Sequence, residues 1–264
     1  MQLAWVTDPH FNFTTPETAR GLLAEITDSG AAGLLLSGDI AEAHDVCQWL
    51  WWLSDTLTVP IFFVLGNHDY YKGSIPAVRA AVAACSAEDE QLTWLSHSSP
   101  VWLTPTTALI GHGGWGDAHL GRWMLTPVRL NDHQLIAELS GLPRALLRQR
   151  LHDLGAEAAR HLHTQLSEAV ETAEQVIVLT HVPPFEGACW HDGAISSPDW
   201  LGDFTCASTG AVIARFASKN PGIRFQVFCG HTHGAGVYRH SNNLTVTTGA
   251  ARYRQPAMQA LIAV

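Results

Sequence analysis

The chain has little positive charge and no paired cysteines. Its 264 residues include 15 lysines and arginines against 24 acidic residues, which gives a net charge of −9 with histidine neutral. Such a chain has no general attraction to nucleic acid or to an anionic membrane, so an anionic ligand needs a local positive site. The five cysteines are widely spaced, with no C-x-x-C pair. This excludes a disulfide framework and a zinc-finger pattern and favours a reducing, cytoplasmic location.

The chain also lacks a hydrophobic run long enough to cross a membrane. One of the longest apolar stretches, Thr58 to Leu65, falls far short of the roughly 20 residues that a spanning helix needs. The first residues, Met1 to Trp5, enter a strand-like run without a basic segment or a cleavage site. We therefore expect a soluble protein that is neither exported nor bound to a membrane.

Hydrophobic residues and histidines are plentiful instead. The hydrophobic fraction of 47% supplies material for a large core, and length and composition together predict one domain over residues 1–264. The same composition excludes a disordered chain. The 15 histidines stand out, because histidine is the commonest metal ligand and titrates near neutral pH.

The first hundred residues repeat a strand–loop–helix pattern. Apolar runs lead through polar loops into helical stretches, which are expected at 19–28, 42–57 and 74–88. Three such units in succession predict a parallel sheet with helices on its faces. The pattern changes after residue 100, where we expect an insertion or substrate-loop region around 111–174 that contains a long helix at 143–172.

Small polar clusters follow directly after the strand-like runs. They are Asp8-x-His10, Gly38-Asp39, Gly66-Asn67-His68-Asp69, His181 and Gly230-His231-Thr232-His233. The carboxyl ends of strands in an open α/β sheet converge on one crevice, so clusters far apart in the sequence can meet there. Turns that serve geometry alone would contain more Gly, Pro and Ser. The sequence therefore predicts that these clusters form one site.

Seven residues of the clusters can bind a metal through oxygen or nitrogen. They are Asp8, His10, Asp39, Asn67, His181, His231 and His233. Seven ligands are too many for one ion, whereas two ions roughly 3.5–4 Å apart with a shared carboxylate would use such a set. Carboxylate, amide and imidazole together suit manganese, iron, zinc or cobalt better than magnesium or calcium. Each residue alone could instead be a cap, a turn residue or a buried histidine.

In this order, the five clusters resemble the full motif set of the calcineurin-like metallophosphoesterase superfamily, over residues 8–233. Small bacterial phosphodiesterase-type members are the most similar branch. The resemblance implies an α/β fold, a four-layer α/β/β/α sandwich of two mixed sheets flanked by helices, with two divalent metal ions. By position, the first metal would be held by Asp8, His10 and His233 and the second by Asn67, His181 and His231, with Asp39 bridging them.

The resemblance also assigns the catalytic residues. His68 would lie beside the scissile phosphate, where it protonates the leaving oxygen or stabilises the transition state. Asp69 would orient the His68 ring through its other nitrogen. Attack by a metal-bridging hydroxide opposite the leaving group needs this division of roles.

Two loops are expected to contact the substrate, and one helix could contact a second subunit. In the first loop, Trp115 could stack on a base or sugar and Arg122 could meet a phosphate, with His112 beside them, although the loop could equally be a packed glycine-rich turn. The second loop contributes Cys189, Trp190 and His191. The helical tryptophans at 49, 51 and 52 indicate core packing or a subunit contact, and an exposed tryptophan face would indicate a homodimer.

Details of the motifs narrow the expected reaction. The segment Ile40-Ala41-Glu42 lacks the tyrosine of purple acid phosphatases and the D-R-G run of Ser/Thr protein phosphatases, and His68 stands where lipid A pathway pyrophosphatases carry Arg. We expect hydrolysis of a small phosphodiester, which could be nucleotide-like. The alternatives are a phosphomonoesterase or nuclease of the same superfamily, a hydrolase with a single metal, and a metal-binding scaffold without catalysis. A net charge of −9 argues against nucleic acid as the partner.

Overall fold

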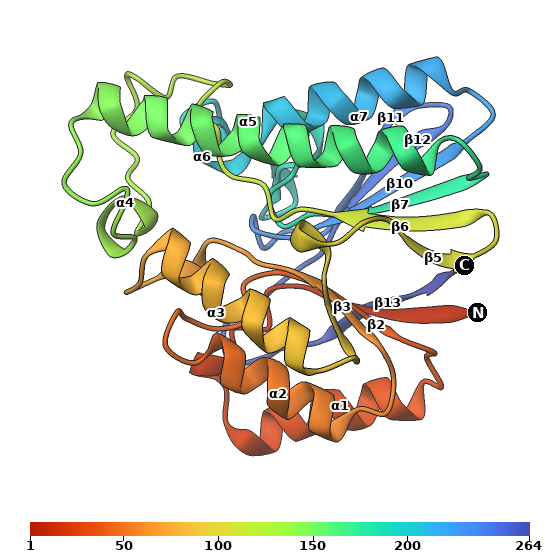
Figure 1. Cartoon of the computed structure of the whole chain (residues 1–264). Coiled ribbons are helices and arrows are strands. Elements are labelled where there is room, and N and C mark those ends of the chain that lie inside the picture. The colour runs from red at the N-terminus through yellow and green to blue at the C-terminus, as the bar shows by residue number, and fades with distance from the viewer.

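The chain folds into two β-sheets that pack face to face, with helices on both outer faces (Figure 1). The computed structural model describes residues 1–264. The first sheet has the strand order β13 (Met258–Ala263), β1 (Gln2–Val6), β2 (Leu34–Ser37), β3 (Ile61–Val64), β4 (Leu92–Trp94). The second sheet has the order β11 (Gly236–Ser241), β12 (Leu244–Thr248), β10 (Arg224–Cys229), β7 (Gln175–Leu179), β6 (Thr107–Gly111), β5 (Val101–Thr104).

Both sheets are mixed. In the first, β1 to β4 run parallel and β13 pairs with β1 in the antiparallel sense. In the second, β6, β7, β10 and β12 run parallel, and the edge strands β5 and β11 are antiparallel to their neighbours. The expected four-layer sandwich of two mixed sheets flanked by helices is confirmed.

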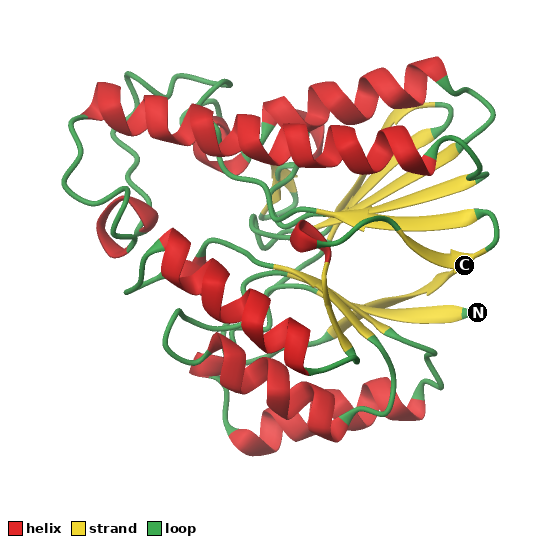
Figure 2. Cartoon of the chain, in the orientation of Figure 1, coloured by secondary structure: helices red, strands yellow, loops and turns green.

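Helices cover the outer face of each sheet, as Figure 2 shows in red. The first sheet carries α1 (Pro16–Asp28), α2 (Val46–Thr56) and α3 (Ile75–Glu88), and the second carries α5 (Arg144–Ala169) and α7 (Ala207–Lys219). Two single-turn helices, α4 (Asp132–Leu135) and α6 (Leu201–Phe204), and the short hairpin of β8 (Trp190–His191) and β9 (Ala194–Ile195) lie in the loops. No helix combines the length and the apolar character that crossing a bilayer requires.

Side-chain alternation along the strands builds three buried layers. Leu3 and Trp5 of β1 point into the core between the sheets, whereas Ala4 and Val6 point into the core under α1 to α3. Strand β7 alternates in the same way between the middle core and the core under α5 and α7. Strands buried on both faces need apolar residues at every position, which explains their continuous hydrophobic runs in the sequence.

Helix starts follow local capping chemistry. The Thr15 hydroxyl accepts a hydrogen bond from the Thr18 N–H at 3.3 Å, with Pro16 in the first turn, so α1 begins at Pro16, ahead of the helical stretch expected at 19–28. The α2 helix begins four residues later than expected. There the Glu42 N–H donates to the Asp45 carboxylate at 3.0 Å, which favours a separate turn over residues 42–45.

The region expected as an insertion divides into two unlike parts. Residues 112–143 form a long irregular connection that contains only α4. The 26 residues of α5, by contrast, pack beside α7 as the outer layer of the second sheet. The extra segment is therefore shorter than the expected 111–174. The short strand β4 was not expected, because three residues give no periodic signal.

The tryptophans of α2 mainly serve the core. Trp49 and Trp52 pack around the buried ring of Phe11, with ring centroids at 5.0 and 6.2 Å from it. Only Trp51 is well exposed, at 44%. One exposed ring does not make the exposed tryptophan surface that would indicate a subunit contact, so a homodimer through this helix stays a prediction.

Candidate metal centre

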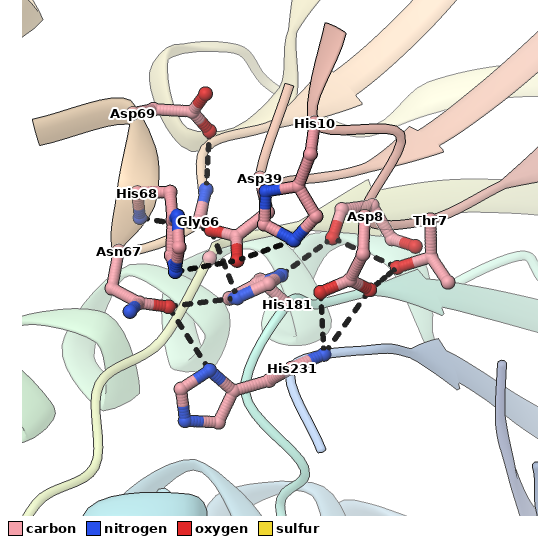
Figure 3. A network of polar contacts seen from close by, with 12 residues as sticks. Thr7, Asp8, His10, Asp39, Gly66, Asn67, His68, Asp69, His181 and His231 are labelled. Carbon is pink, nitrogen blue, oxygen red and sulfur yellow. Dashed lines mark hydrogen bonds and ion pairs between the residues drawn. The ribbon is translucent and has the colours of Figure 1, made fainter. Parts of the chain in front are cut away.

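The polar clusters of the sequence meet where the two sheets adjoin, at the carboxyl ends of their parallel strands (Figure 3). Asp8, Asp39 and Asn67 follow β1, β2 and β3 of the first sheet, and His181 and His231 follow β7 and β10 of the second. The His231 N–H donates to the Asp8 carboxylate at 3.1 Å, although the two residues lie 223 positions apart. The seven predicted ligands therefore lie together.

Four of these residues form one half of the centre. Asp8, His10, Asp39 and His233 each offer a ligand atom within 4.8 Å of all the others. The Nε2 atoms of His10 and His233 lie 3.3 Å apart, and the Asp8 Oδ1 is 3.5 Å from the His233 Nε2. The Asp39 Oδ2 lies 3.7 Å from the His10 Nε2. Three residues come from the first sheet and one from the second.

The other half is built around Asn67. Its Oδ1 lies 3.0 Å from the His181 Nε2 and 3.0 Å from the His231 Nδ1. The Asp39 Oδ1 is 3.3 Å from the same His181 nitrogen. Asp39 thus turns one carboxylate oxygen toward each half of the centre, which is the arrangement of a bridging ligand.

Hydrogen bonds behind the rings leave lone pairs facing one another. The His181 Nδ1 lies 2.9 Å from the Ser37 carbonyl and the His231 Nε2 lies 3.1 Å from the Asp203 carbonyl, so these two nitrogens carry the protons. The opposite nitrogen of each ring then presents a lone pair to the Asn67 Oδ1, which is itself an acceptor. Facing acceptors at 3.0 Å repel each other unless a cation lies among them.

The buried carboxylates lead to the same conclusion. Burial raises the pKa of Asp39 well above its usual value, and the neighbouring Asp8 charge raises it further. For Asp8, burial also acts to raise the pKa, but three nearby histidines outweigh it and lower the pKa. No lysine or arginine pairs with either carboxylate. Divalent cations would supply the charge that two buried carboxylates need.

Backbone strain is concentrated at the same residues. Five of the ligand candidates have positive φ, namely Asp8 at 47°, His10 at 44°, Asp39 at 53°, His231 at 70° and His233 at 60°. Residues other than glycine rarely adopt this region, and such strain collects at functional sites.

Two glycines of the motifs are required by close approach. A Cβ on Gly66 would collide with Asp39, and one on Gly230 would collide with Asp8.

His68 lines the centre, but its expected partner lies elsewhere. The His68 Nε2 is 3.9 Å from the Asp39 Oδ2, and its ring stacks on Tyr71 with centroids 4.2 Å apart. Asp69 does not contact the ring. Its carboxylate accepts from the N–H groups of Ala41 and Gly66, both at 2.8 Å, and the His68 Nδ1 has no partner. The predicted orienting role of Asp69 is wrong, because its side chain instead ties together the loops after β2 and β3.

An open cavity of about 220 Å³ lies over the metal centre. Its lining contains Asp39, Asn67, His68, Tyr71, Leu130, Asn131, His191, Phe204, His231, Thr232, His233 and Tyr253. Among the residues of the two loops that are predicted to contact the substrate, only His191 is present. Its Nδ1 lies 2.9 Å from the Thr232 carbonyl, between two of the ligand candidates in sequence.

The other predicted substrate residues lie away from this cavity. His112 and Trp115 line a separate cavity near α3, and Trp115 is only 3% exposed because its ring packs on Tyr70. The Arg122 guanidinium pairs with Asp199 at 2.8 Å.

In the second loop, burial raises the pKa of the Cys189 thiol to about 12, and Trp190 packs over Gly234 and Gly236. Substrate contact from the two loops therefore stays a prediction that the geometry supports only at His191.

Sequence reasoning missed two residues that shape the centre. Asp132 of α4 accepts from the Asn67 Nδ2 at 2.8 Å and from the Tyr71 hydroxyl at 2.6 Å, which fixes the Asn67 Oδ1 toward the histidines. Tyr253 follows β12 and covers His10 with a ring-centroid distance of 4.6 Å. Neither residue belongs to a strand-end motif, so no local pattern indicated it.

Comparison with known proteins identifies the family. The sequence model described as calcineurin-like phosphoesterase matches residues 1–235, which include every ligand candidate. The chain belongs to the calcineurin-like phosphoesterase family. Calcineurin-like phosphoesterases bind a pair of divalent metals, and the buried Asp and His cluster of this member is consistent with such a centre. No curated protein matches this sequence.

Solved structures show the same fold at low sequence identity. The phosphopantetheinyl hydrolase from Mycobacterium tuberculosis is similar with a TM-score of 0.66 and 14% identity, over 96% of this calcineurin-like phosphoesterase and 90% of the other chain. A dimetal phosphatase from Danio rerio gives a TM-score of 0.57 and 13% identity, over 95% and 87% of the two chains. At these identities the likeness concerns the fold alone.

Proposed function

We propose that this calcineurin-like phosphoesterase is a dinuclear metal-dependent hydrolase of small phosphoesters, with diesters preferred over monoesters. One observation carries the proposal. The carboxylate of Asp39 turns one oxygen toward each of two clusters of ligand candidates, with the His10 Nε2 at 3.7 Å from one oxygen and the His181 Nε2 at 3.3 Å from the other. A purely structural role would not explain why the Asn67 Oδ1 faces the lone pairs of His181 and His231.

The residues present fit two cations. Asp8, His10 and His233 would hold the first and Asn67, His181 and His231 the second, with Asp39 shared. When bound, such a pair polarises phosphoryl oxygens and supplies a reactive hydroxide near neutral pH. Manganese, iron and zinc suit this donor set.

The side chains around the cavity bind and position the ester. With Asp8 and Asp39 beneath it, the cavity repels a phosphate unless cations neutralise them, so metal and substrate binding depend on each other. His68 lies at the cavity wall with its Nε2 turned toward Asp39. Burial, aided by His181, lowers the pKa of His68 to about 3, so a neutral ring donates a hydrogen bond to the ester oxygen rather than a full proton.

Size and charge support a small substrate. The cavity of about 220 Å³ accommodates a phosphoryl group with a modest organic part, and the net charge of −9 disfavours nucleic acid. The five cysteines are free, which suits the proposed cytoplasmic location. A non-catalytic scaffold is less well supported, because all seven ligand candidates and His68 are in place.

Metal analysis together with two chromogenic esters tests the proposal. Protein purified with manganese should contain about two metals per chain and hydrolyse bis-p-nitrophenyl phosphate faster than p-nitrophenyl phosphate. Turnover of the monoester alone would make the protein a phosphatase. One metal per chain would indicate a mononuclear hydrolase, two metals without turnover would favour the scaffold, and no bound metal would refute the proposal.

A further inference from the structure

Tyr253 lies at the mouth of the active-site cavity on a turn with an unusual backbone. The Gln255 N–H donates to the Arg252 carbonyl at 3.0 Å, which closes a four-residue turn with Tyr253 as its second residue. Arg254, the third residue, has φ of 67°, where glycine is the ordinary choice. The turn is tied to the metal centre, because the Ala251 N–H donates to the His233 carbonyl at 3.2 Å.

The Tyr253 ring is both anchored and accessible. Its centroid lies 4.6 Å from that of His10 and 5.3 Å from that of His233, so one part of the ring packs on ligand candidates. Phe13 meets it edge-on at 5.3 Å. The residue is nevertheless 48% exposed and lines the cavity that also contains His68. A large aromatic ring left open beside a phosphate site offers a surface for a flat apolar group.

Charge on the same turn suits an anionic ligand. Arg252 and Arg254 flank Tyr253, and neither forms an ion pair. They are two of only 15 lysines and arginines in the chain. An open ring at the cavity, with two arginines on the same turn, matches a phosphoester that carries a planar aromatic group.

We propose that Tyr253 is a specificity-determining residue that stacks on an aromatic group in the organic part of the substrate. This inference rests on the proposed function and specifies its substrate class. Stacking on Tyr253 holds the organic part at the rim while the phosphoryl group sits over the metals. Esters with an aliphatic organic part lack this contact and bind more weakly.

Binding of two phosphonates isolates this contact from catalysis. Phenylphosphonate and methylphosphonate share the anionic head group and differ in the ring, and isothermal titration to manganese-loaded protein measures both. The wild type should bind phenylphosphonate about tenfold more tightly, as expected for one stacking contact. Tyr253→Ala should reduce this ratio to within about twofold, and Tyr253→Phe should keep it. Tyr253→Leu, which retains apolar packing on His10, should also lose the preference.

A control variant distinguishes stacking on Tyr253 from a general effect of exposed aromatic surface. Trp51→Ala removes an aromatic ring of similar exposure, 44%, on the outer helix α2, and it should leave the ratio unchanged. The ratio compares two ligands on one protein, so a partial loss of metal affects both equally. An unchanged ratio in Tyr253→Ala and Tyr253→Leu, or a wild-type ratio near one, would overturn the inference. Failure of the wild type to bind either phosphonate would also overturn the inference, whereas metal content and diester turnover test the proposed function separately.

Discussion

Replacing Asp132 tests how the long loop before α5 supports the second half of the metal centre. The buried carboxylate accepts from the Asn67 Nδ2 at 2.8 Å and from the Tyr71 hydroxyl at 2.6 Å. Hydrogen bonds to a charged group contribute roughly 1.5–3 kcal/mol each. The Asn67 Nδ2 also donates to the Tyr71 hydroxyl at 3.2 Å, and this hydrogen bond remains when Asp132 is removed, so part of the lost stability is compensated. We expect Asp132→Ala to lower the free energy of unfolding of the metal-free protein by about 3 kcal/mol.

The same substitution should weaken metal binding, because Asn67 is then free to rotate. Loss of such an outer partner typically reduces metal affinity 10- to 100-fold, roughly. Urea unfolding of metal-free protein gives the first quantity, and manganese titration followed by calorimetry gives the second. Asp199→Ala is the matched control, since its ion pair with Arg122 is largely exposed and should be worth less than about 1 kcal/mol. Wild-type values of both quantities in Asp132→Ala would refute the reasoning.

Three further results are expected. EDTA should lower Tm by about 10–20 °C in calorimetry, since each of two metals at 100 times Kd adds about 2.7 kcal/mol, and Asp39→Asn should reduce this shift. His68→Ala should lower turnover by about 10²–10³, as for the loss of one hydrogen-bond donor, while elemental analysis still finds about two metals; an emptied centre would contradict its assigned role. Burial, aided by His161, lowers the pKa of His112 to about 3. Between pH 7 and 5 only the unfolded chain takes up this proton, so His112 alone lowers stability by about 2 kcal/mol over this range. Urea titrations should show a smaller fall in His112→Asn and an unchanged one in the exposed control His163→Asn.

Sequence reasoning reached the metal centre because strand ends are locally recognisable. The apolar runs of β1, β2, β3, β7 and β10 are each followed closely by Asp, Asn or His, and parallel strands deliver these residues to one edge. The structure brings Asp8 and His231 into contact as that argument requires. Gly66 and Gly230 of the motifs also indicate the site, because Asp39 lies too close to Gly66, and Asp8 too close to Gly230, for a side chain at either position.

Residues outside the strand ends could not be placed in this way. Asp69 adjoins His68 in the chain, yet it points away to the Ala41 and Gly66 amides, because neighbouring side chains of the 3-10 turn over residues 68–70 point in different directions. The sequence places Trp115 in a glycine-rich loop where it could contact the substrate, but its ring is buried against Tyr70. Tyr253 reaches the cavity from a turn after β12, and the path of an irregular loop depends on tertiary packing rather than on a local pattern.

The origin of the ligands in both sheets has a consequence for folding. His10 and His233 approach each other across 223 positions of sequence, and the two halves of the centre each combine residues from the first and second sheets. A cation bound there acts as a crosslink that closes nearly the whole chain into a loop. The complete ligand sets arise only after both sheets have docked, so metal capture completes folding rather than starting it. Manganese binding during refolding should therefore report the final docking step, and bound cations would hold the two sheets together at this edge.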